Sequence, residues 1–279
     1  MIREWNDSTI KRLLSEGRGA GYGKDYKPWL QVQDIASQGR STRIYSFTSQ
    51  RVMHMLSDLQ LYYFYLLEFD DRVVDIRENY PALDFHELNV LLDEELTKKL
   101  FNSKTKAPHV FEVSFLVTRM DQQNKPYYEA RAVKSSSELE KKATLQRLEL
   151  LHRYFERKQI DFGIVTEKEI NKQLARNIGW ILTAYDIQDY PDISGNFSYL
   201  RQDLMQYLSS PFETYQKAFA RLESNYQLEE GMGLILFKHL LATKQLNMDL
   251  SQKIIFSDRV EKYNLQVPIL EGEIHAIGG

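Results

Sequence analysis

Residues 110–118 read VFEVSFLVT, and their alternation decides how the first half of the chain folds. Apolar side chains at every second position are typical of a β-strand with one buried face. On one face lie Phe111, Val113, Phe115 and Val117. On the other lie Glu112, Ser114 and Leu116. A turn-like RMDQQNK follows, and PYYEARAVK then predicts a second strand of a hairpin, ending at Lys134.

The segments on either side of this hairpin extend the pattern. Residues 135–159, SSSELEKKATLQRLELLHRYFERKQ, predict an amphipathic helix with serine caps and a leucine-rich apolar stripe. IDFGIVT at 160–166 predicts a third strand, and VVDIRENYPAL at 73–83 a short strand and turn. Upstream, 56–69 predicts a buried helix capped by Ser57 or Asp58. The order is helix, strand, strand, helix, strand.

The pattern changes after Thr166, where the periodicity becomes mainly helical. We therefore expect an α/β domain over residues 1–166 and a small α-rich domain over 167–255. The segment NMDLSQKI at 247–254 is compatible with a β-wing. Residues 256–279 lack periodicity and predict a flexible or partner-binding tail.

Composition excludes several classes of protein. A chain of 279 residues with 43 % hydrophobic content can bury a substantial core. The absence of cysteine excludes disulfides, thiolate metal sites and cysteine nucleophiles, and is compatible with a reducing cytoplasm. The N-terminus MIREWNDSTIKRLL is not a signal peptide, and no apolar run reaches the ~20 residues of a membrane span. We expect a cytoplasmic protein without a membrane span.

The charges are unevenly distributed. Residues 1–54, here called the basic arm, hold nine Lys or Arg and five Asp or Glu, whereas residues 55–100 hold four and eleven. This asymmetry favours a polar partner such as nucleic acid, although two solvated faces would look the same. The glycine-rich loop in the arm lacks the spacing of a phosphate-binding P-loop. The predicted contacts to a DNA backbone are Arg18, Lys24, Arg40 and Arg43.

Other familiar catalytic patterns are missing. None of the six histidines stands in an H-x-x-x-H or H-E-x-x-H pair, which disfavours a histidine-based zinc site. There is no G-x-S-x-G element of a hydrolase. What remains is Lys134 at a strand end, within an order of elements that resembles the core of restriction-type nucleases. In that chemistry carboxylates hold Mg²⁺, the ion activates water, and a lysine orients the nucleophile.

The chain as a whole resembles the TnsA family, the endonuclease subunit of the heteromeric transposase of Tn-seven-like elements. The resemblance is carried by EGRGAGYGKDYKPWLQVQ, SQGRSTRIYS, RVMHMLSDLQL, VVDIRENYPAL, the helix and strand from Val133 to Thr166, and RNIGWI. It implies a restriction-endonuclease-like N-terminal domain and a winged-helix-like C-terminal domain. It also implies Mg²⁺-dependent nicking of transposon 5′ ends, beside a TnsB-type transposase and a TnsC-type AAA+ ATPase. A prokaryotic, nucleoid-associated location is implied only by this resemblance.

The resemblance breaks down at the metal ligands. The family's helix glutamate falls on Gln60 in SDLQL, and its strand aspartate on Ser114 in SFLV. The family's glutamine two residues before the lysine falls on Ala132, and only Lys134 is kept. Two charged oxygen ligands are thus replaced by neutral groups, which removes most of the attraction for a hard cation.

We therefore expect a TnsA-like subunit that binds DNA, needs no cofactor and does not cleave, with Lys134 a vestige that still touches a DNA phosphate. Two alternatives stay open. An active Mg²⁺-dependent nuclease would need relocated ligands, and Glu112 shares a strand face with Ser114. A pure assembly adaptor would recruit the ATPase through residues 245–279.

Overall fold

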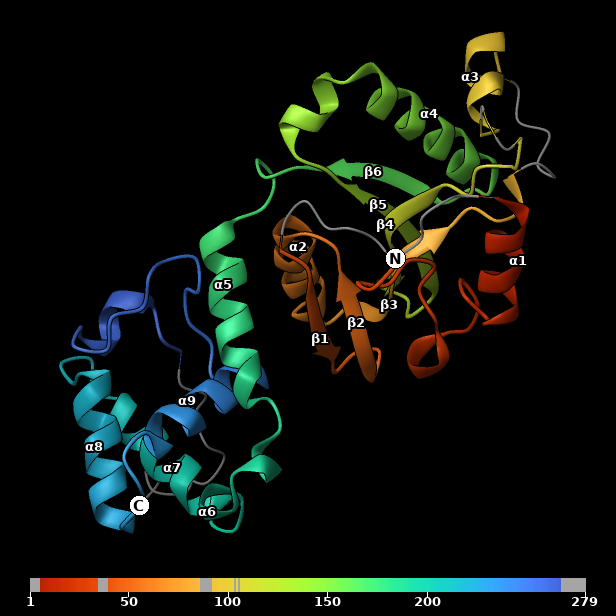
Figure 1. The fold of residues 1–279 in the computed structure, drawn as a ribbon. Helices are drawn as coiled ribbons and strands as arrows, with labels where there is room; N and C mark the ends of the chain where they lie inside the picture. The colour runs from red at the N-terminus through yellow and green to blue at the C-terminus, as the bar shows by residue number, and fades with distance from the viewer. Residues whose placement is uncertain (1–5, 35–39, 86–91, 103, 105, 267–279) are drawn as a thin grey trace. The chain divides into compact units, whose positions relative to one another are not determined.

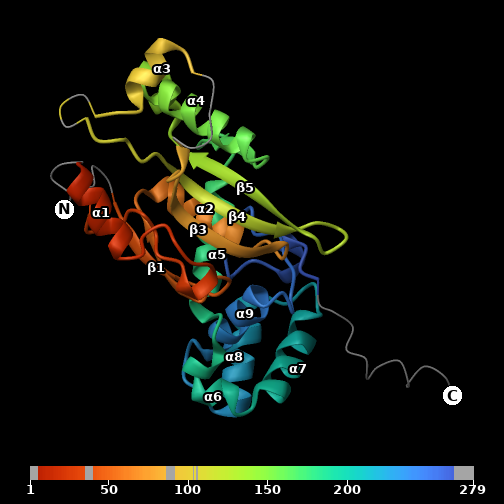
Figure 2. The ribbon, with the colours of Figure 1, turned by 90° about the vertical axis from the view of Figure 1, so that its right-hand side faces the viewer.

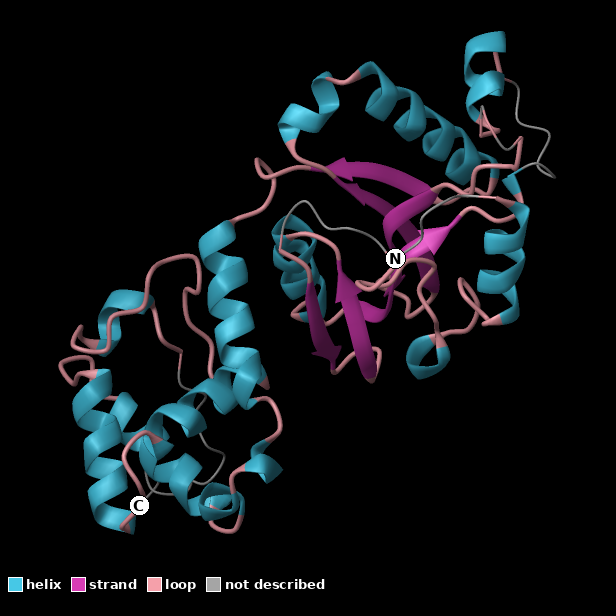
Figure 3. Ribbon diagram, in the orientation of Figure 1, coloured by secondary structure: helices cyan, strands magenta, loops and turns pink. Residues whose placement is uncertain are grey.

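The computed structural model describes residues 6–34, 40–85, 92–102, 104 and 106–266. The chain divides into two compact units, Met1–Asn171 and Lys172–Gly279. The division falls five residues beyond the expected domain end at Thr166. Figure 3 shows that the first unit mixes strands and helices, whereas the second is built from helices and loops.

A four-stranded sheet organises the N-terminal unit, in the spatial order β3-β4-β5-β6. The strands are β3 (Val73–Pro81), β4 (Glu112–Met120), β5 (Pro126–Val133) and β6 (Asp161–Val165). β3, β4 and β5 are antiparallel, and β6 runs parallel to β5. The predicted hairpin and third strand are therefore confirmed, and the segment after the buried helix forms β3, a nine-residue strand at the edge of this sheet. A parallel β5–β6 pair requires a crossover, which the helix α4 (Lys142–Arg157) provides.

Helices and a small hairpin cover the two faces of this sheet (Figures 1 and 2). On one face, the apolar stripe of α4 packs on sheet residues that include Leu116, Ala130 and Ala132. On the other face, α2 (Asp58–Glu68) and the hairpin β1 (Thr42–Ser46) and β2 (Arg51–Met55) bury a second cluster. Ser57 caps α2, as expected, because its hydroxyl accepts the N–H of Gln60 at 3.2 Å. The unit also contains α1 (Asp7–Ser15) and α3 (Glu94–Lys99).

The glycine-rich segment packs against β3, around the short helix η1 (Gly23–Asp25). Gly19 and Gly21 both have positive φ, +77° and +96°. A Cβ at Gly19 would lie 2.4 Å from Pro81 Cγ, so only glycine allows this close approach. Beside it, Tyr26 donates its hydroxyl hydrogen to the carbonyl of Glu78 at 3.1 Å. The glycine-rich loop is thus a folded part of the N-terminal unit.

The C-terminal unit consists of helices and connecting loops in its described residues, with two isolated β-bridges. Its α-helices are α5 (Lys172–Ile181), α6 (Pro191–Ser194), α7 (Phe197–Leu208), α8 (Tyr215–Tyr226) and α9 (Met232–Ala242). Tyr215 lies at the centre of the core, with its ring 5.2 Å from that of Phe237 and 5.9 Å from that of Tyr263. No described helix combines the length and apolarity that crossing a bilayer demands.

Two expectations for this unit need correction. Residues 247–254 form turns and a single bridge, Asn247 to Gln266, so the expected β-wing is not a hairpin. Residues 256–266 are not a loose tail, because Val260 and Tyr263 are buried and Arg259 bridges to Thr214. The remaining tail residues, 267–279, lie outside the described residues. The winged-helix-like assignment stays a prediction.

Candidate functional site: a cavity around Lys134

A cavity of about 570 Å³ opens where the N-terminus of α2, the ends of β4 and β5 and the start of α4 meet. All four site positions expected from the sequence line it: Gln60, Ser114, Ala132 and Lys134. The fold thus brings together residues that lie up to 74 positions apart in the chain, from Gln60 to Lys134. Its volume is in the usual range for a ligand site.

Ser114 lies where β4 and β5 separate. The last backbone pair on this side is Phe115 with Arg131. One residue further, the N–H of Val133 donates to Ser114 Oγ at 2.9 Å. The side chain therefore continues the pairing where the backbone ladder ends, and the hydroxyl is engaged within the protein. Ser114 is only 7 % exposed.

Gln60 has a local role at the start of α2. Its Oε1 accepts the N–H of Leu56 at 2.7 Å, while its own N–H is held by Ser57. Together these bonds resemble a capping box, displaced by one residue toward the N-terminus. The amide oxygen is thus occupied in fixing how the chain enters the helix.

Ala132 lies near the end of the adjacent strand β5, and Lys134 directly follows its last residue, Val133. Ala132 is buried at 2 % exposure and offers no ligand atom. The N–H of Lys134 donates to the carbonyl of Val165 at 3.0 Å, which fixes its backbone beside β6. Its side chain is half-buried and makes no ion pair with any described residue. Lys134 is therefore a cation available to the cavity.

Glu112 and Arg147 form an ion pair that links β4 to α4, with Arg147 Nη2 2.5 Å from Glu112 Oε2. Both residues line the cavity. The guanidinium also lies over the ring of Phe111, 5.9 Å from its centre. The sequence pattern pointed to Glu112 but missed Arg147. The available signal was the four-residue spacing of Ala143, Arg147 and Leu151, which places all three on the cavity side of α4.

These residues do not fit a magnesium site. Mg²⁺ prefers octahedral oxygen ligands that include carboxylates. Ser114 and Gln60 use their oxygens for backbone hydrogen bonds, and Ala132 has none to offer. Glu112 is neutralised by Arg147. Across the described part of the chain, no group of three or more His, Cys, Asp or Glu side chains is placed to hold a metal ion.

Of the four predicted DNA contacts in the basic arm, one is buried and three are exposed. Arg18 is 7 % exposed, and its Nη1 binds Asp34 Oδ2 at 2.9 Å, so this arginine is a buried structural residue. That corrects the expectation for Arg18. Lys24 and Arg40 are exposed. Arg43 is also exposed, and its Nη2 donates to Gln33 Oε1 at 2.9 Å.

His54 lies among these arginines. Its Nδ1 accepts the N–H of Val32 at 3.3 Å. Burial, together with the positive charges of Arg43 and Arg18, lowers the pKa of His54 to about 4. This histidine is therefore neutral at physiological pH.

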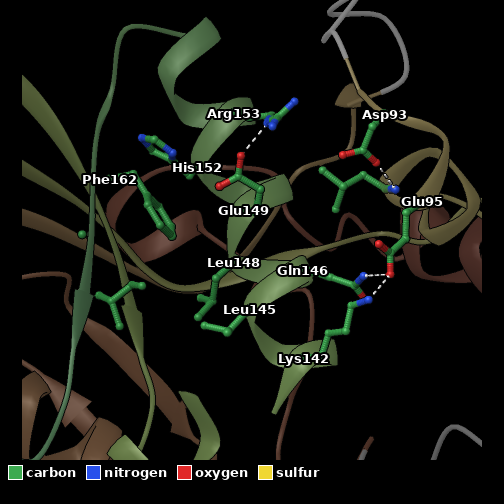
Figure 4. Close-up of a pocket in the computed structure, with 13 residues that line it drawn as sticks. Asp93, Glu95, Lys142, Leu145, Gln146, Leu148, Glu149, His152, Arg153 and Phe162 are labelled. Carbon is green, nitrogen blue, oxygen red and sulfur yellow. Dashed lines mark hydrogen bonds and ion pairs between the residues drawn. The ribbon is translucent and has the colours of Figure 1, made fainter. Parts of the chain in front are cut away.

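A second hollow, of about 700 Å³, lies on the outer side of α4 beside β6 (Figure 4). None of the predicted site residues lines it. Its charged groups pair with one another, as Figure 4 shows for Glu149 with Arg153 and for Glu95 with Lys142. The cavity around Lys134 is therefore the better candidate site.

Comparisons with known proteins agree with this architecture. Residues 70–167 match the family model described as the TnsA-like endonuclease N terminal, and 169–250 match that described as the TnsA endonuclease C terminal. The N-terminal α/β unit thus fits an endonuclease-like fold. One relative is the Transposon Tn7 transposition protein TnsA of Escherichia coli, 40 % identical over 178 residues. The match spans 63 % of this chain and 63 % of that relative.

The two models adjoin one another and together cover more than half of the chain. The chain belongs to the TnsA family.

Proposed function

We propose that this protein is a TnsA-like subunit of a heteromeric transposase that binds transposon ends and does not cleave them. Membership of the TnsA family supports a role in Tn7-like transposition. The partners in this proposal are transposon-end DNA, a TnsB-type transposase and a TnsC-type ATPase. In such an element the 3′ ends are cut by the partner alone, and the 5′ ends stay joined to the donor.

One observation carries the non-cleaving part of the proposal. The cavity that a nuclease would use for metal is lined by neutral groups at Gln60, Ser114 and Ala132, and the first two are hydrogen-bonded to backbone. Metal-assisted hydrolysis of a phosphodiester depends on a bound cation that activates water. Without charged ligands at these positions, no step through such an ion can be assigned to this chain.

The test is a nicking assay with the purified protein, its TnsB-type partner, transposon-end DNA and Mg²⁺ or Mn²⁺. We expect 3′-end processing by the partner and no 5′ nick. A 5′ nick that Lys134→Ala abolishes would refute the proposal.

The alternative, an active nuclease with a relocated ligand, centres on Glu112, which lines the same cavity. It makes a separate prediction, that Glu112→Gln abolishes a metal-dependent 5′ nick. As a positive control, the triple variant Gln60→Glu, Ser114→Asp and Ala132→Gln restores the family's ligand pattern. Cleavage by this variant alone would show that the assay detects nicking.

A further inference from the structure

We propose that the cavity around Lys134 binds a DNA phosphate directly, without a divalent ion, and that Arg147 is its second phosphate contact. The inference deepens the proposed function and relies on it for the ligand. In a metal-dependent nuclease, a cation joins acidic protein groups to the anionic phosphate. Here the cavity supplies its own cations.

The charges that line the cavity are few. The acidic groups are Glu112 and Glu138, and the basic groups are Lys134 and Arg147. Glu138 is engaged in a capping box, where its Oε2 accepts the N–H of Ser135 at 3.2 Å. Glu112 is paired with Arg147. The acids are therefore satisfied inside the protein, while Lys134 has no acidic partner among the described residues.

Arg147 is suited to a second anion. A guanidinium carries five N–H donors in a planar fork, and carboxylate and phosphate match that fork equally well. Glu112 is its one acidic partner in the described part of the chain, through a single nitrogen. An incoming phosphate can use the other donors, or replace Glu112 altogether. Glu112 thus acts as a built-in competitor that keeps Arg147 oriented while no DNA is bound.

The position of the two cations also agrees with a phosphate between them. Lys134 directly follows β5 and Arg147 lies on the second turn of α4, so the two cations reach the cavity from different elements. The remaining walls carry polar groups already bonded within the chain, at Gln60, Ser114 and Asn79. Nothing else that lines the cavity offers a free charge to a ligand. A single phosphodiester bound between Lys134 and Arg147 would therefore give both cations an anionic partner.

The experiment measures binding of a short transposon-end duplex to the full chain in EDTA, by fluorescence anisotropy over a range of salt concentrations. Each phosphate contact contributes about −0.9 to the slope of log K against log salt concentration. Lys134→Met and Arg147→Met should each weaken binding several-fold and make that slope shallower by about this amount. Arg153→Met is the matched control for Arg147, because it removes a Glu-paired arginine from the same helix outside the cavity.

Glu112→Gln gives the sharpest outcome. Removing the competing carboxylate should tighten DNA binding several-fold, both in EDTA and in Mg²⁺. If Glu112 were instead a metal ligand, the same substitution would weaken the binding measured in Mg²⁺. Loss of binding in Glu112→Gln, binding that requires Mg²⁺, or salt slopes unchanged in both cation variants would each overturn the inference. Thermal unfolding of every variant checks that it is folded. If Arg147→Met unfolds, Lys134→Met still tests the inference, because Lys134 is only half-buried and its loss breaks no ion pair with a described residue.

The same DNA, incubated with Mg²⁺, separates this inference from the proposed function. A 5′ nick would refute the absence of cleavage yet leave metal-free phosphate binding standing. Binding that depends on metal, without any nick, would refute metal-free phosphate binding and leave the proposed absence of cleavage standing.

Discussion

Buried charges in the N-terminal unit show how single residues fix this fold. Glu78 is almost fully buried in β3. Its carboxylate accepts a hydrogen bond from Arg51 Nη1 at 2.9 Å and a second one from Arg51 Nη2. The same carboxylate accepts the N–H of His54 at 3.1 Å. One acidic group therefore joins the hairpin β1–β2 to the central sheet, close to the cavity.

Breaking this pair should cost far more than breaking a surface pair. Arg51→Met leaves the Glu78 carboxylate buried without its partner, and we expect the free energy of unfolding to fall by about 3–5 kcal/mol. Chemical denaturation of the purified variant measures this loss. Lys98→Met, which removes an exposed pair with Glu94, is the control and should change stability by less than about 0.5 kcal/mol. Equal losses in the two variants would contradict the assigned role.

His54 should make stability depend on pH. Its pKa in the folded chain, about 4, lies below its ordinary value of 6.5, so the unfolded chain binds the proton more readily. Stability is therefore fully present above pH 6.5 and falls as the pH drops toward 4. Because the residue is only about half buried, we expect a loss of about 1–2 kcal/mol after allowing for solvent screening.

The measurement is urea unfolding at pH 7 and pH 4.5 for the wild type and for His54→Asn, whose amide oxygen can still accept the Val32 N–H. The variant should lose less stability between the two pH values. A pH dependence identical to the wild type would assign the effect to other groups.

At the scale of elements, the glycine-rich segment offers a matched pair of substitutions. Gly19 and Gly23 both have positive φ, but an added Cβ at Gly19 meets Pro81, whereas nothing lies within 4 Å at Gly23. Gly23→Ala should lower the free energy of unfolding by about 1 kcal/mol, through the strained backbone conformation alone. Gly19→Ala should cost about 1–3 kcal/mol more, because the side chain also forces β3 and the loop apart. Thermal unfolding of the two variants should show the larger fall in Tm for Gly19→Ala.

The elements around the site were readable from sequence because each depends on local signals. Alternating apolar residues mark β4, a serine cap marks α2, and an apolar stripe marks α4. The serines expected to cap the long helix instead begin a separate short helix, η3 (Ser136–Glu140), and α4 starts at Lys142 without a side-chain cap. The burial of Arg18 could not be predicted in this way. Its partner Asp34 lies 16 residues away, and a charged residue in a glycine-rich loop gives no local sign of which side it faces.

The ion pair of Glu112 and Arg147 was hidden for a similar reason. It joins β4 to α4, and only the packed helix reveals which polar side chains meet across the cavity. The absent β-wing is a different case. Short segments in which polar and apolar residues mix, such as 247–254, are compatible with strand or loop, and here tertiary packing selects the loop.

At the scale of the whole molecule, the chemistry of the cavity predicts how the protein responds to metal. A ligand that binds only the folded state raises stability by RT ln(1 + [L]/Kd), about 2.7 kcal/mol when its concentration is 100 times Kd. Because no acidic cluster is in place around Lys134, we expect millimolar Mg²⁺ to leave Tm unchanged relative to EDTA. Differential scanning fluorimetry of the full chain checks this expectation. The triple variant with restored acids is the comparison, and a rise in Tm for the wild type would reveal a metal site.

The hydrogen bond from Val133 to Ser114 also bears on how such a chain can evolve. A carboxylate returning to position 114 would face Glu112 two residues along the same strand, and without a metal the two negative charges repel. Each early step back toward cleavage would therefore lower stability before any benefit appears, since position 60 must change as well. Proteins have only about 5–15 kcal/mol of stability to lose. Under the proposed non-cleaving function, Ser114 therefore favours retention of this form, because a return to the acidic ligand lowers stability first.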